Sequence, residues 1–356
     1  MHDIRLRLAS FAAAAALVLG AAGSAASPAN AADLPSTELK VIGTWSNLSQ
    51  FKNYEKPFWT ETLAKDSNGA VTATVQGFNE LGLKGNEVVR LMEQGVIDVG
   101  ATVLGYLAAD DAKNEAIDLA GLSPDVATAR KVTEAYKPAL AALYAKEYDI
   151  KLLGIWPYSA QVLFCNAPIA GLKDLAGTKV RTGNRTLAEF VGALGGTGVT
   201  LSFSEVVPAL QKGVVDCAIT GSLSGYSAKW HEVATHLYAL PVGWSQVMLA
   251  ASSKAWNRLD PKVQGFLATE IAGLEDRVWQ AAAHESEQGI ACNTGGTCEF
   301  GKPAAMTLVP VSDADRATLV TVLKDVVVPK WAERCGKECA AEWAKTAGAA
   351  AGYTAD

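Results

Sequence analysis

The feature that most restricts the fold of this chain is the alternation of short, β-branched runs with longer amphipathic segments. The strand-like runs of the first half are 38–45, 70–78, 97–104 and 150–158, and the helical segments between them are 54–67, 85–96 and 125–147. Strands that alternate with helices of this length are typical of βαβ units. We therefore predict a first α/β lobe with a largely parallel sheet.

The same alternation starts again in the middle of the chain. The strand-like runs are 160–166, 179–182, 199–202 and 214–220, and the helical segments are 185–196 and 204–213. This repetition predicts a second α/β lobe. A further run, 245–252, has the composition of a strand that fits either lobe. We therefore expect the two lobes to be joined by more than one crossing.

A long helix is predicted after this run. Asp260 can cap its first turn, with Pro261 at the first helical position. Apolar residues then recur at three- and four-residue spacing, namely Val263, Phe266, Leu267, Ile271, Leu274 and Val278. The pattern predicts about eight turns, which is long enough to lie along both lobes. The C-terminal part, with a short helix near Trp331 to Trp343, is expected to wrap the second lobe.

The N-terminus has the pattern of an export signal. Arg5 and Arg7 precede an apolar run from Phe11 to Ala22, and small residues end at Ala31 in an A-x-A site. We expect a cleaved signal peptide over 1–31, a periplasmic protein, and a mature net charge of −7 in place of −6. An acidic chain lacks the basic stripe that nucleic-acid binding requires.

Six cysteines in an exported chain predict disulfides, because the compartment is oxidising. The simplest pairing joins Cys292 to Cys298 and Cys335 to Cys339, although spacing also permits bridges between the two clusters. Cys165 and Cys217 each lie near the end of a strand-like run, and they form either a third bridge or two small buried thiols. No C-x-x-C pair or nearby histidine supports a zinc site, so we expect no metal.

Motifs of secreted enzymes are incomplete. His231 and His236 are five apart, whereas a zincin helix needs its two histidines four apart. Leu223 occupies the place of the serine in a nucleophile elbow. The glycines of 192–198 lack the order of a dinucleotide cradle. We therefore expect a protein that is not an enzyme and that carries no cofactor.

The stretch "TKVRTGN" places Arg181 at the end of a short strand. A guanidinium there must meet water or an anion, because it carries five donors and keeps its charge. A surface or interlobe ion pair with Asp or Glu satisfies this need as well as a ligand does.

The block from Asp174 to Thr220, "DLAGTKVRTGNRTLAEFVGALGGTGVTLSFSEVVPALQKGVVDCAIT", resembles the solute-binding proteins of TRAP transporters, the tripartite ATP-independent periplasmic uptake systems. Weaker agreement extends over most of the mature chain. The resemblance implies a two-lobe α/β fold of the periplasmic binding protein type, with a long helix spanning both lobes. It also implies an organic acid ligand in the cleft and a membrane permease as partner.

In that family the arginine at the position of Arg181 binds the substrate carboxylate in a bidentate salt bridge. Many relatives keep a second arginine near the position of Val162, beside Gln161, and an asparagine at the position of Thr220. Since both are missing here, the resemblance implies one carboxylate on a neutral or aromatic remainder. The candidate substrate-binding residues are Arg181, Thr220, Asn184, Gln161, Tyr158, Trp156, Trp244, Trp45 and Asn47.

We expect the first lobe to comprise 32–157 and about 246–285, and the second lobe 158–245 and about 286–356. The protein is expected to be a monomer. Two rival functions stay open, a secreted two-lobe enzyme acting on carboxylates and a sensory protein that hands its signal to a membrane receptor.

Overall fold

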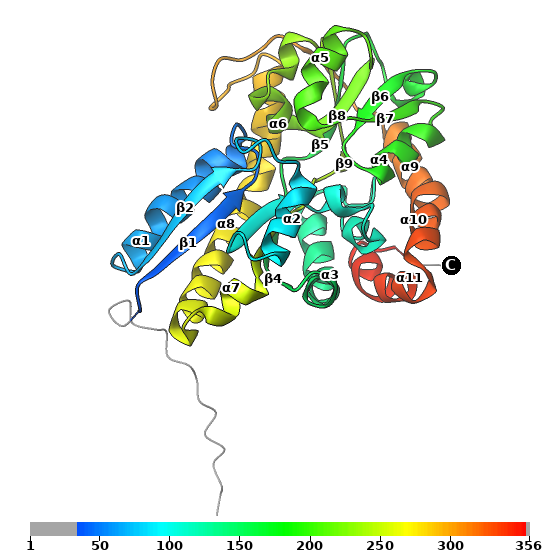
Figure 1. The fold of residues 1–356 in the computed structure, drawn as a ribbon. Coiled ribbons are helices and arrows are strands. Elements are labelled where there is room, and N and C mark those ends of the chain that lie inside the picture. Colours follow the sequence, from blue (N-terminus) through cyan, green and yellow to red (C-terminus); the bar gives the residue numbers. More distant parts are fainter. Residues whose placement is uncertain (1–33, 354–356) are drawn as a thin grey trace, which may run out of the picture.

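The computed structural model describes residues 34–353, so the predicted signal peptide lies outside the described residues. Two β-sheets organise these residues, one in each of two lobes (Figure 1). The first lobe contains a five-stranded sheet in the order β2-β1-β3-β10-β4. Its strands are β1 (Thr37–Gly43), β2 (Val71–Gly77), β3 (Val99–Val103), β4 (Ile150–Trp156) and β10 (Val247–Ser252).

The second lobe contains a six-stranded sheet in the order β11-β9-β5-β8-β6-β7. Its strands are β5 (Gln161–Cys165), β6 (Lys179–Thr182), β7 (Thr197–Thr200), β8 (Cys217–Gly221), β9 (His236–Gly243) and β11 (Thr307–Val309). The two-lobe α/β architecture is therefore confirmed.

Both sheets are mixed, which corrects the expectation of largely parallel pairing. β1 is parallel to β2 and β3, and β6 is parallel to β7 and β8. In contrast, β10 is antiparallel to β3 and β4, and β5 is antiparallel to β8 and β9. β5 and β10 are the strands that the chain enters from the other lobe, and for this reason each runs opposite to its neighbours in the sheet.

Two crossings lead directly from strand to strand. β4 passes into β5 through residues 157–160, and β9 passes into β10 through 244–246. The run 245–252, which fitted either lobe from its sequence, thus belongs to the first sheet. β9 was not predicted, because Val242 is its only β-branched residue and Pro241 interrupts its donors. The lobe boundaries given above stay a prediction.

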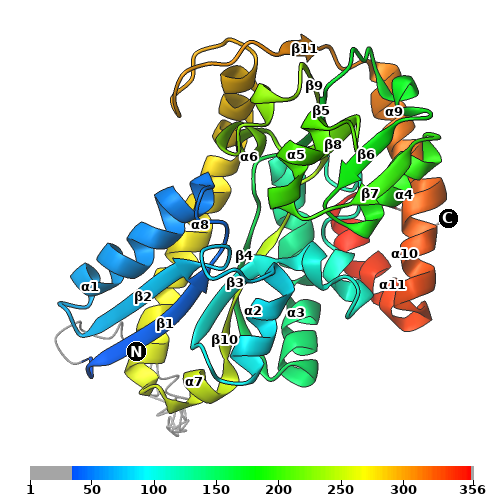
Figure 2. The same cartoon turned by 45° about the horizontal axis from the view of Figure 1, so that its top comes forward.

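Helices cover the faces of the sheets (Figures 1 and 2). In the first lobe they are α1 (Leu63–Asp66), α2 (Gly85–Glu93), α3 (Val126–Glu147) and α7 (Ser253–Arg258), with π-helical segments η2 (Gln50–Glu55) and η3 (Phe58–Thr62) and 3₁₀ turns η4 (Leu104–Leu107) and η5 (Ala112–Glu115). In the second lobe they are α4 (Arg185–Ala193), α5 (Val206–Gln211) and α6 (Ser222–Ser227), with 3₁₀ turns η6 (Leu172–Leu175), η7 (Phe203–Glu205) and η8 (Trp230–Glu232). Within 34–353, no helix combines the length and hydropathy needed to cross a membrane.

The long helix α8 (Pro261–Asn293) runs along both lobes (Figure 1), as predicted. Asp260 caps it by accepting from the backbone N–H of Lys262 at 2.8 Å. Its first part packs on β4 and its last part on α6. Gly289 permits the second contact, because a Cβ there would lie 2.2 Å from the backbone nitrogen of Leu223.

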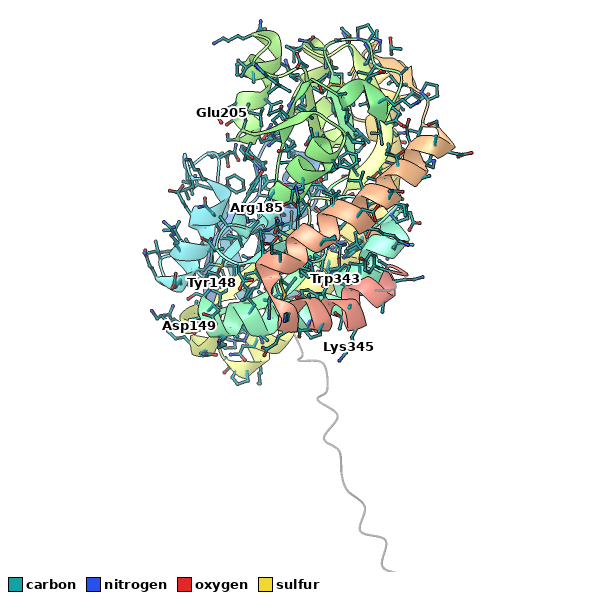
Figure 3. All side chains as sticks on the ribbon, turned by 90° about the vertical axis from the view of Figure 1, so that its right-hand side faces the viewer. Tyr148, Asp149, Arg185, Glu205, Trp343 and Lys345 are labelled. Atoms are coloured by element: carbon teal, nitrogen blue, oxygen red, sulfur yellow. A yellow bond between two sulfur atoms is a disulfide. The ribbon has the colours of Figure 1, made fainter. Side chains whose placement is uncertain are left out.

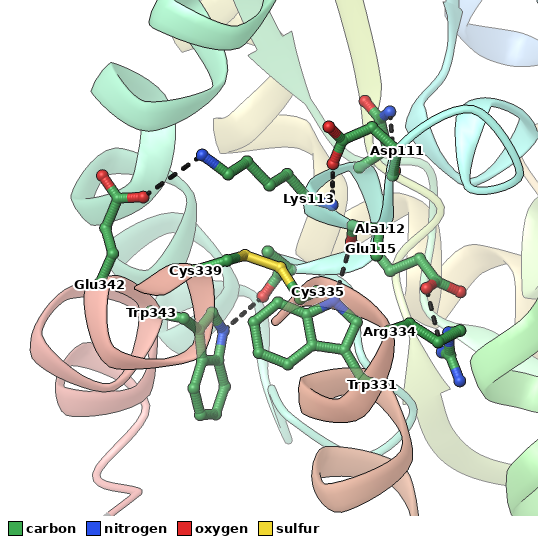
Figure 4. Close-up of a disulfide and its surroundings, with 12 residues drawn as sticks. Asp111, Ala112, Lys113, Glu115, Trp331, Arg334, Cys335, Cys339, Glu342 and Trp343 are labelled. Atoms are coloured by element: carbon green, nitrogen blue, oxygen red, sulfur yellow. Dashed lines mark hydrogen bonds and ion pairs between the residues drawn. A yellow bond between two sulfur atoms is a disulfide. The ribbon is translucent and has the colours of Figure 1, made fainter. Parts of the chain in front are cut away.

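The C-terminal segment comprises α9 (Asp313–Val322), η9 (Leu323–Val327), α10 (Val328–Cys335), α11 (Lys337–Trp343) and η10 (Ala344–Gly348). Figure 3 shows it descending from the second lobe to Trp343 beside the first. In the second lobe Tyr238 donates to Asp315 at 2.7 Å. In the first lobe the indole N–H groups of Trp331 and Trp343 donate to carbonyl groups of η5 and Ala116 (Figure 4). The segment therefore bridges both lobes, whereas the sequence predicted that it wraps only the second.

Three disulfides are formed, Cys165–Cys217, Cys292–Cys298 and Cys335–Cys339. Cys165 lies directly opposite Cys217 in the register of β5 and β8. The third bridge, which the sequence left open, thus joins neighbouring strands. Figure 4 shows the Cys335–Cys339 bridge beside Trp331 and Trp343.

Candidate functional site

Arg181 lies at the carboxyl ends of the parallel strands in the second lobe. Its Nε donates to the carbonyl oxygen of Leu201 at 3.1 Å, just after β7, and its Nη1 donates to that of Ile219 in β8 at 3.0 Å. The guanidinium carbon is 5.9 Å from the ring centroid of Trp230. Ligands of open α/β sheets bind at this edge.

Arg181 is a buried cation without a protein counter-ion. Arg181 is 3% exposed. No other Lys or Arg among residues 34–353 is buried. Within the same residues no Asp or Glu forms an ion pair with it. Burial lowers the pKa of Arg181 to about 10, so it remains charged at neutral pH. The interlobe or surface ion pair considered above is therefore not formed by the described residues.

Three predicted polar residues lie on the same edge of the second sheet. Asn184 caps α4, because its Oδ1 accepts from the backbone N–H of Leu187 at 2.9 Å, and its amide N–H groups have no hydrogen-bond acceptor among residues 34–353. Thr220 follows Ile219 in β8 and is 6% exposed. Gln161 begins β5 opposite the end of β8, and its buried Oε1 has no hydrogen-bond partner within 34–353.

Aromatic side chains connect the first lobe to Arg181. Trp45 follows β1 and is half-buried, with its Nε1 3.4 Å from the hydroxyl oxygen of Tyr106. Its ring centroid lies 5.2 Å from that of Phe203 in the second lobe. Phe203 in turn lies 5.4 Å from Trp230, against which Arg181 packs. The lobes thus meet at the contact of Trp45 with Phe203, which is one ring removed from the Trp230 side chain that packs on Arg181.

The other predicted residues have different surroundings. Trp156 and Trp244 lie in an apolar core, and the indole of Trp244 donates to the carbonyl oxygen of Ser123 at 3.0 Å. Tyr158 is 3% exposed, and its hydroxyl lies near Thr44 without a hydrogen bond of normal geometry. Asn47 is half-buried in the turn after Trp45. Core packing and this hydrogen bond account for Trp244 without a ligand, whereas the buried Nε1 of Trp156 has no acceptor within residues 34–353.

Sequence reasoning missed Tyr106, Phe203 and Trp230. All three lie in short 3₁₀ turns that follow or connect larger elements. Nothing in their local pattern distinguishes them from other aromatic residues. Tyr106 and Phe203 do lie three positions after the strands β3 and β7, at the sheet edge, which is a weak signal, whereas Trp230 follows helix α6 and has none.

Buried carboxyl groups lie at the crossings between the lobes. Asp118 accepts from the backbone N–H groups of Trp244 at 2.7 Å and Ser245 at 2.9 Å. Glu285 of α8 accepts from the hydroxyl of Ser49 at 3.0 Å. Burial raises the pKa of each carboxyl group to about 7. No cluster of three or more metal-ligating side chains occurs in the part of the chain that the structure describes.

Known proteins resemble this chain in sequence and fold. A family model described as "Bacterial extracellular solute-binding protein, family 7" matches residues 44–333. The C4-dicarboxylate-binding periplasmic protein DctP of Rhodobacter capsulatus is 30% identical over 285 residues, which are 78% of this chain and 81% of that protein. The ectoine-binding periplasmic protein TeaA of Halomonas elongata is 25% identical over 230 residues, 63% and 67% of the two chains.

Solved structures share the fold. An extracytoplasmic solute receptor of Bordetella pertussis that binds pyroglutamic acid superposes with a TM-score of 0.76 at 23% identity, covering 87% of this chain and 99% of the receptor. A TRAP periplasmic solute-binding protein of Desulfovibrio salexigens with bound orotic acid gives 0.75 at 19% identity, covering 86% and 99%. Identities this low establish the two-lobe fold alone.

Proposed function

This chain belongs to family 7 of the bacterial extracellular solute-binding proteins and is a TRAP-type, dicarboxylate-binding-protein-like receptor; we propose that it captures a monocarboxylic acid with a neutral or aromatic remainder through Arg181. The family consists of extracytoplasmic receptors for solutes, which are not enzymes. The identity of the acid and the salt bridge to Arg181 are the parts that we propose.

One observation carries the proposal, namely that Arg181 is buried and charged without a carboxylate among residues 34–353. Removing a cation from water is costly unless an anion and hydrogen bonds replace the water. The two carbonyl groups leave Nη2 without an acceptor among the described residues. A carboxylate suits the planar fork of a guanidinium, and the bond gains strength away from water.

The neutral remainder is supported by the polar groups around the site. With no second Lys or Arg buried in the described chain, a second carboxylate would lack a comparable partner. Unpaired buried atoms on the candidate residues and on Trp230, which packs on Arg181, are neutral: Oε1 of Gln161, the hydroxyl of Tyr158, Nε1 of Trp156 and Nε1 of Trp230. Trp45, Phe203 and Trp230 supply apolar surface. Aromatic walls with a few polar groups are typical of small-molecule sites.

Capture requires the lobes to separate and close. Arg181 is 3% exposed, so an acid cannot reach it while Trp45 lies against Phe203. We infer a hinge at the crossings 157–160 and 244–246, which are short and lie between the two sheets. An acid that contacts both lobes only when they are closed binds that state more tightly and shifts the population toward it.

Delivery then requires a TRAP permease in the membrane, which would recognise the closed form. We further propose that the predicted signal peptide is cleaved after Ala31 and that the receptor is a monomer in the periplasm. Turnover of an acid by the pure protein would instead favour a secreted enzyme. Activation of a membrane receptor without uptake would favour a sensory protein.

The test begins with native mass spectrometry of the protein as purified, followed by a thermal-shift and calorimetry panel of pyroglutamate, orotate, succinate and ectoine. A bound acid raises the melting temperature of wild type. We expect Arg181→Ala to lose that binding, and Arg258→Ala, whose exposed side chain lies on α7, to keep it. Unchanged acid binding by Arg181→Ala would disprove the salt bridge. Tighter binding of succinate than of pyroglutamate and orotate would overturn the neutral remainder.

A further inference from the structure

Tyr106 is held at the meeting point of the lobes. It lies in η4, directly after β3, and its ring packs against the side-chain-free face of Gly85, where a Cβ would lie 2.5 Å from the ring. The preceding residue, Gly105, touches the second lobe, since a Cβ there would lie 3.2 Å from the Cβ of Asn184. Backbone contacts on both sides therefore fix where the tyrosine ring lies relative to the Arg181 site.

The hydroxyl of Tyr106 has a proton to donate. Its oxygen accepts from Nε1 of Trp45 at 3.4 Å, and no acceptor for its own proton occurs within residues 34–353. The residue is half-buried, so one side of it is not covered by protein. Burial raises the pKa of Tyr106 while the charge of Arg181 lowers it, which also indicates that the two groups are neighbours. The phenol is therefore neutral at pH 7 and can donate a hydrogen bond.

We propose that Tyr106 is the first-lobe donor to the carboxylate that Arg181 binds from the second lobe. This inference rests on the proposed function, because it requires an acid at Arg181. The carboxylate would accept from the guanidinium on one side and from the phenol on the other. Closure is then coupled to the charged group itself rather than to the remainder of the ligand. Different acids could thus close the lobes through the same pair of residues.

The alternative is that Tyr106 only fills space between Gly85 and Trp45. A packing role predicts that Tyr106→Phe leaves both stability and affinity unchanged, because phenylalanine keeps the ring. A donor role predicts a loss of affinity without a loss of stability. Hydrogen bonds to charged groups are strong enough that their removal weakens binding about tenfold or more.

The experiment compares full-length mature protein as wild type, Tyr106→Phe, Arg181→Ala and the control Tyr226→Phe. The hydroxyl of Tyr226 donates to the carbonyl oxygen of Lys302 at 2.8 Å, so this variant removes a tyrosine hydrogen bond that involves neither Arg181 nor Trp45. Calorimetry measures Kd for pyroglutamate, orotate, succinate and ectoine. Fluorine NMR of 3-fluorotyrosine-labelled protein follows the Tyr106 resonance, which is assigned by its absence from Tyr106→Phe.

We expect Tyr106→Phe to raise Kd about tenfold or more for each carboxylate that wild type binds, with a ligand-free melting temperature close to wild type, since the hydrogen bond lost in that state is the long one from Trp45 at 3.4 Å. Tyr226→Phe should keep the wild-type Kd, and the Tyr106 resonance should shift on acid binding in wild type but not in Arg181→Ala. An acid that requires Arg181 yet binds Tyr106→Phe within twofold of wild type would overturn this inference alone. Acid binding that survives Arg181→Ala, or no binding of any acid, would overturn the proposed function and this inference together.

Discussion

Arg334 joins the two lobes by donating from Nη2 to Glu115 of η5 at 3.0 Å, while the same guanidinium also pairs with Glu189 of α4. Glu115 belongs to the first lobe and Glu189 to the second (Figure 4 shows the Glu115 contact). Burial raises the pKa of Glu115, and the positive charge of Arg334 lowers it by less. The attraction between Arg334 and Glu115 therefore offsets only part of the cost of burying this carboxylate. The protein thus contains an interlobe arginine that is ion-paired with two carboxylates, in contrast to Arg181, which has no carboxylate partner within residues 34–353.

Replacing Arg334 should therefore destabilise the protein. Arg334→Gln leaves Glu115, whose side chain is 2% exposed, without a cation, and we expect a loss of about 3 kcal/mol in the free energy of unfolding. Urea denaturation measures the change. Lys146→Gln is the control. It breaks the ion pair between Lys146, whose side chain is 82% exposed, and Glu147, and it should not change stability. A loss below about 1 kcal/mol for Arg334→Gln would argue against a stabilising bridge.

Replacing Arg181 should have a different effect on the ligand-free protein. Arg181→Met removes two hydrogen bonds to carbonyl groups but leaves no carboxylate unpaired among the described residues. Because the buried charge is itself costly, we expect stability within about 1 kcal/mol of wild type, or higher. The same urea experiment without ligand checks this. A loss as large as that of Arg334→Gln would mean that the charge stabilises the fold.

Closure should depend on the small size of Gly105. Its backbone lies so near Asn184 that a Cβ would be 3.2 Å from the Cβ of that residue. Gly105→Val should raise Kd for the acid about tenfold, because the added methyl groups collide only when the lobes are closed. Calorimetry and the ligand-free melting temperature separate this effect from unfolding. Gly265→Val is the control, since the space around Gly265 is open, and it should bind normally.

The disulfides should contribute unequally to stability. Cys165–Cys217 closes a loop with a sequence separation of 52, and Cys292–Cys298 one with a separation of 6. The loss of chain entropy in the unfolded state predicts about 4 kcal/mol for the first bridge and about 2 kcal/mol for the second. Urea denaturation of the two double alanine variants tests the order. Equal losses, or a larger loss for Cys292→Ala/Cys298→Ala, would contradict it.

Stability should fall as pH rises from about 4.5 to neutrality. Burial raises the pKa of Glu285 from 4.5 to about 7, so the folded protein holds a proton that the unfolded chain releases. The resulting stabilisation is complete below about pH 4 and is lost as pH rises to about 7, an effect of roughly 3 kcal/mol. Unfolding measured between pH 5 and 8 should show this slope, and Glu285→Gln should reduce it. An equal slope in the variant would exclude Glu285 as the cause.

Local patterns in the sequence predicted much of the fold. The cap at Asp260 and the apolar spacing after it predicted α8, and the β-branched run 179–182 predicted β6, which carries Arg181. β9 was missed because its residues have little strand preference of their own and are held by pairing with β5. Antiparallel pairing at the crossings could not be predicted either, since it depends on how the chain passes between sheets.

Periodicity, caps and turn residues act over a few neighbouring positions, and they predicted the two-lobe α/β class, the long helix and an arginine at a strand end. The burial of Arg181 without a carboxylate from residues 34–353, the core position of Trp156 and Trp244, and the place of Tyr106, Phe203 and Trp230 around the site became clear from the packed molecule. These outcomes depend on contacts between distant segments from both lobes. Such contacts arise when the lobes pack together, and no local pattern records them.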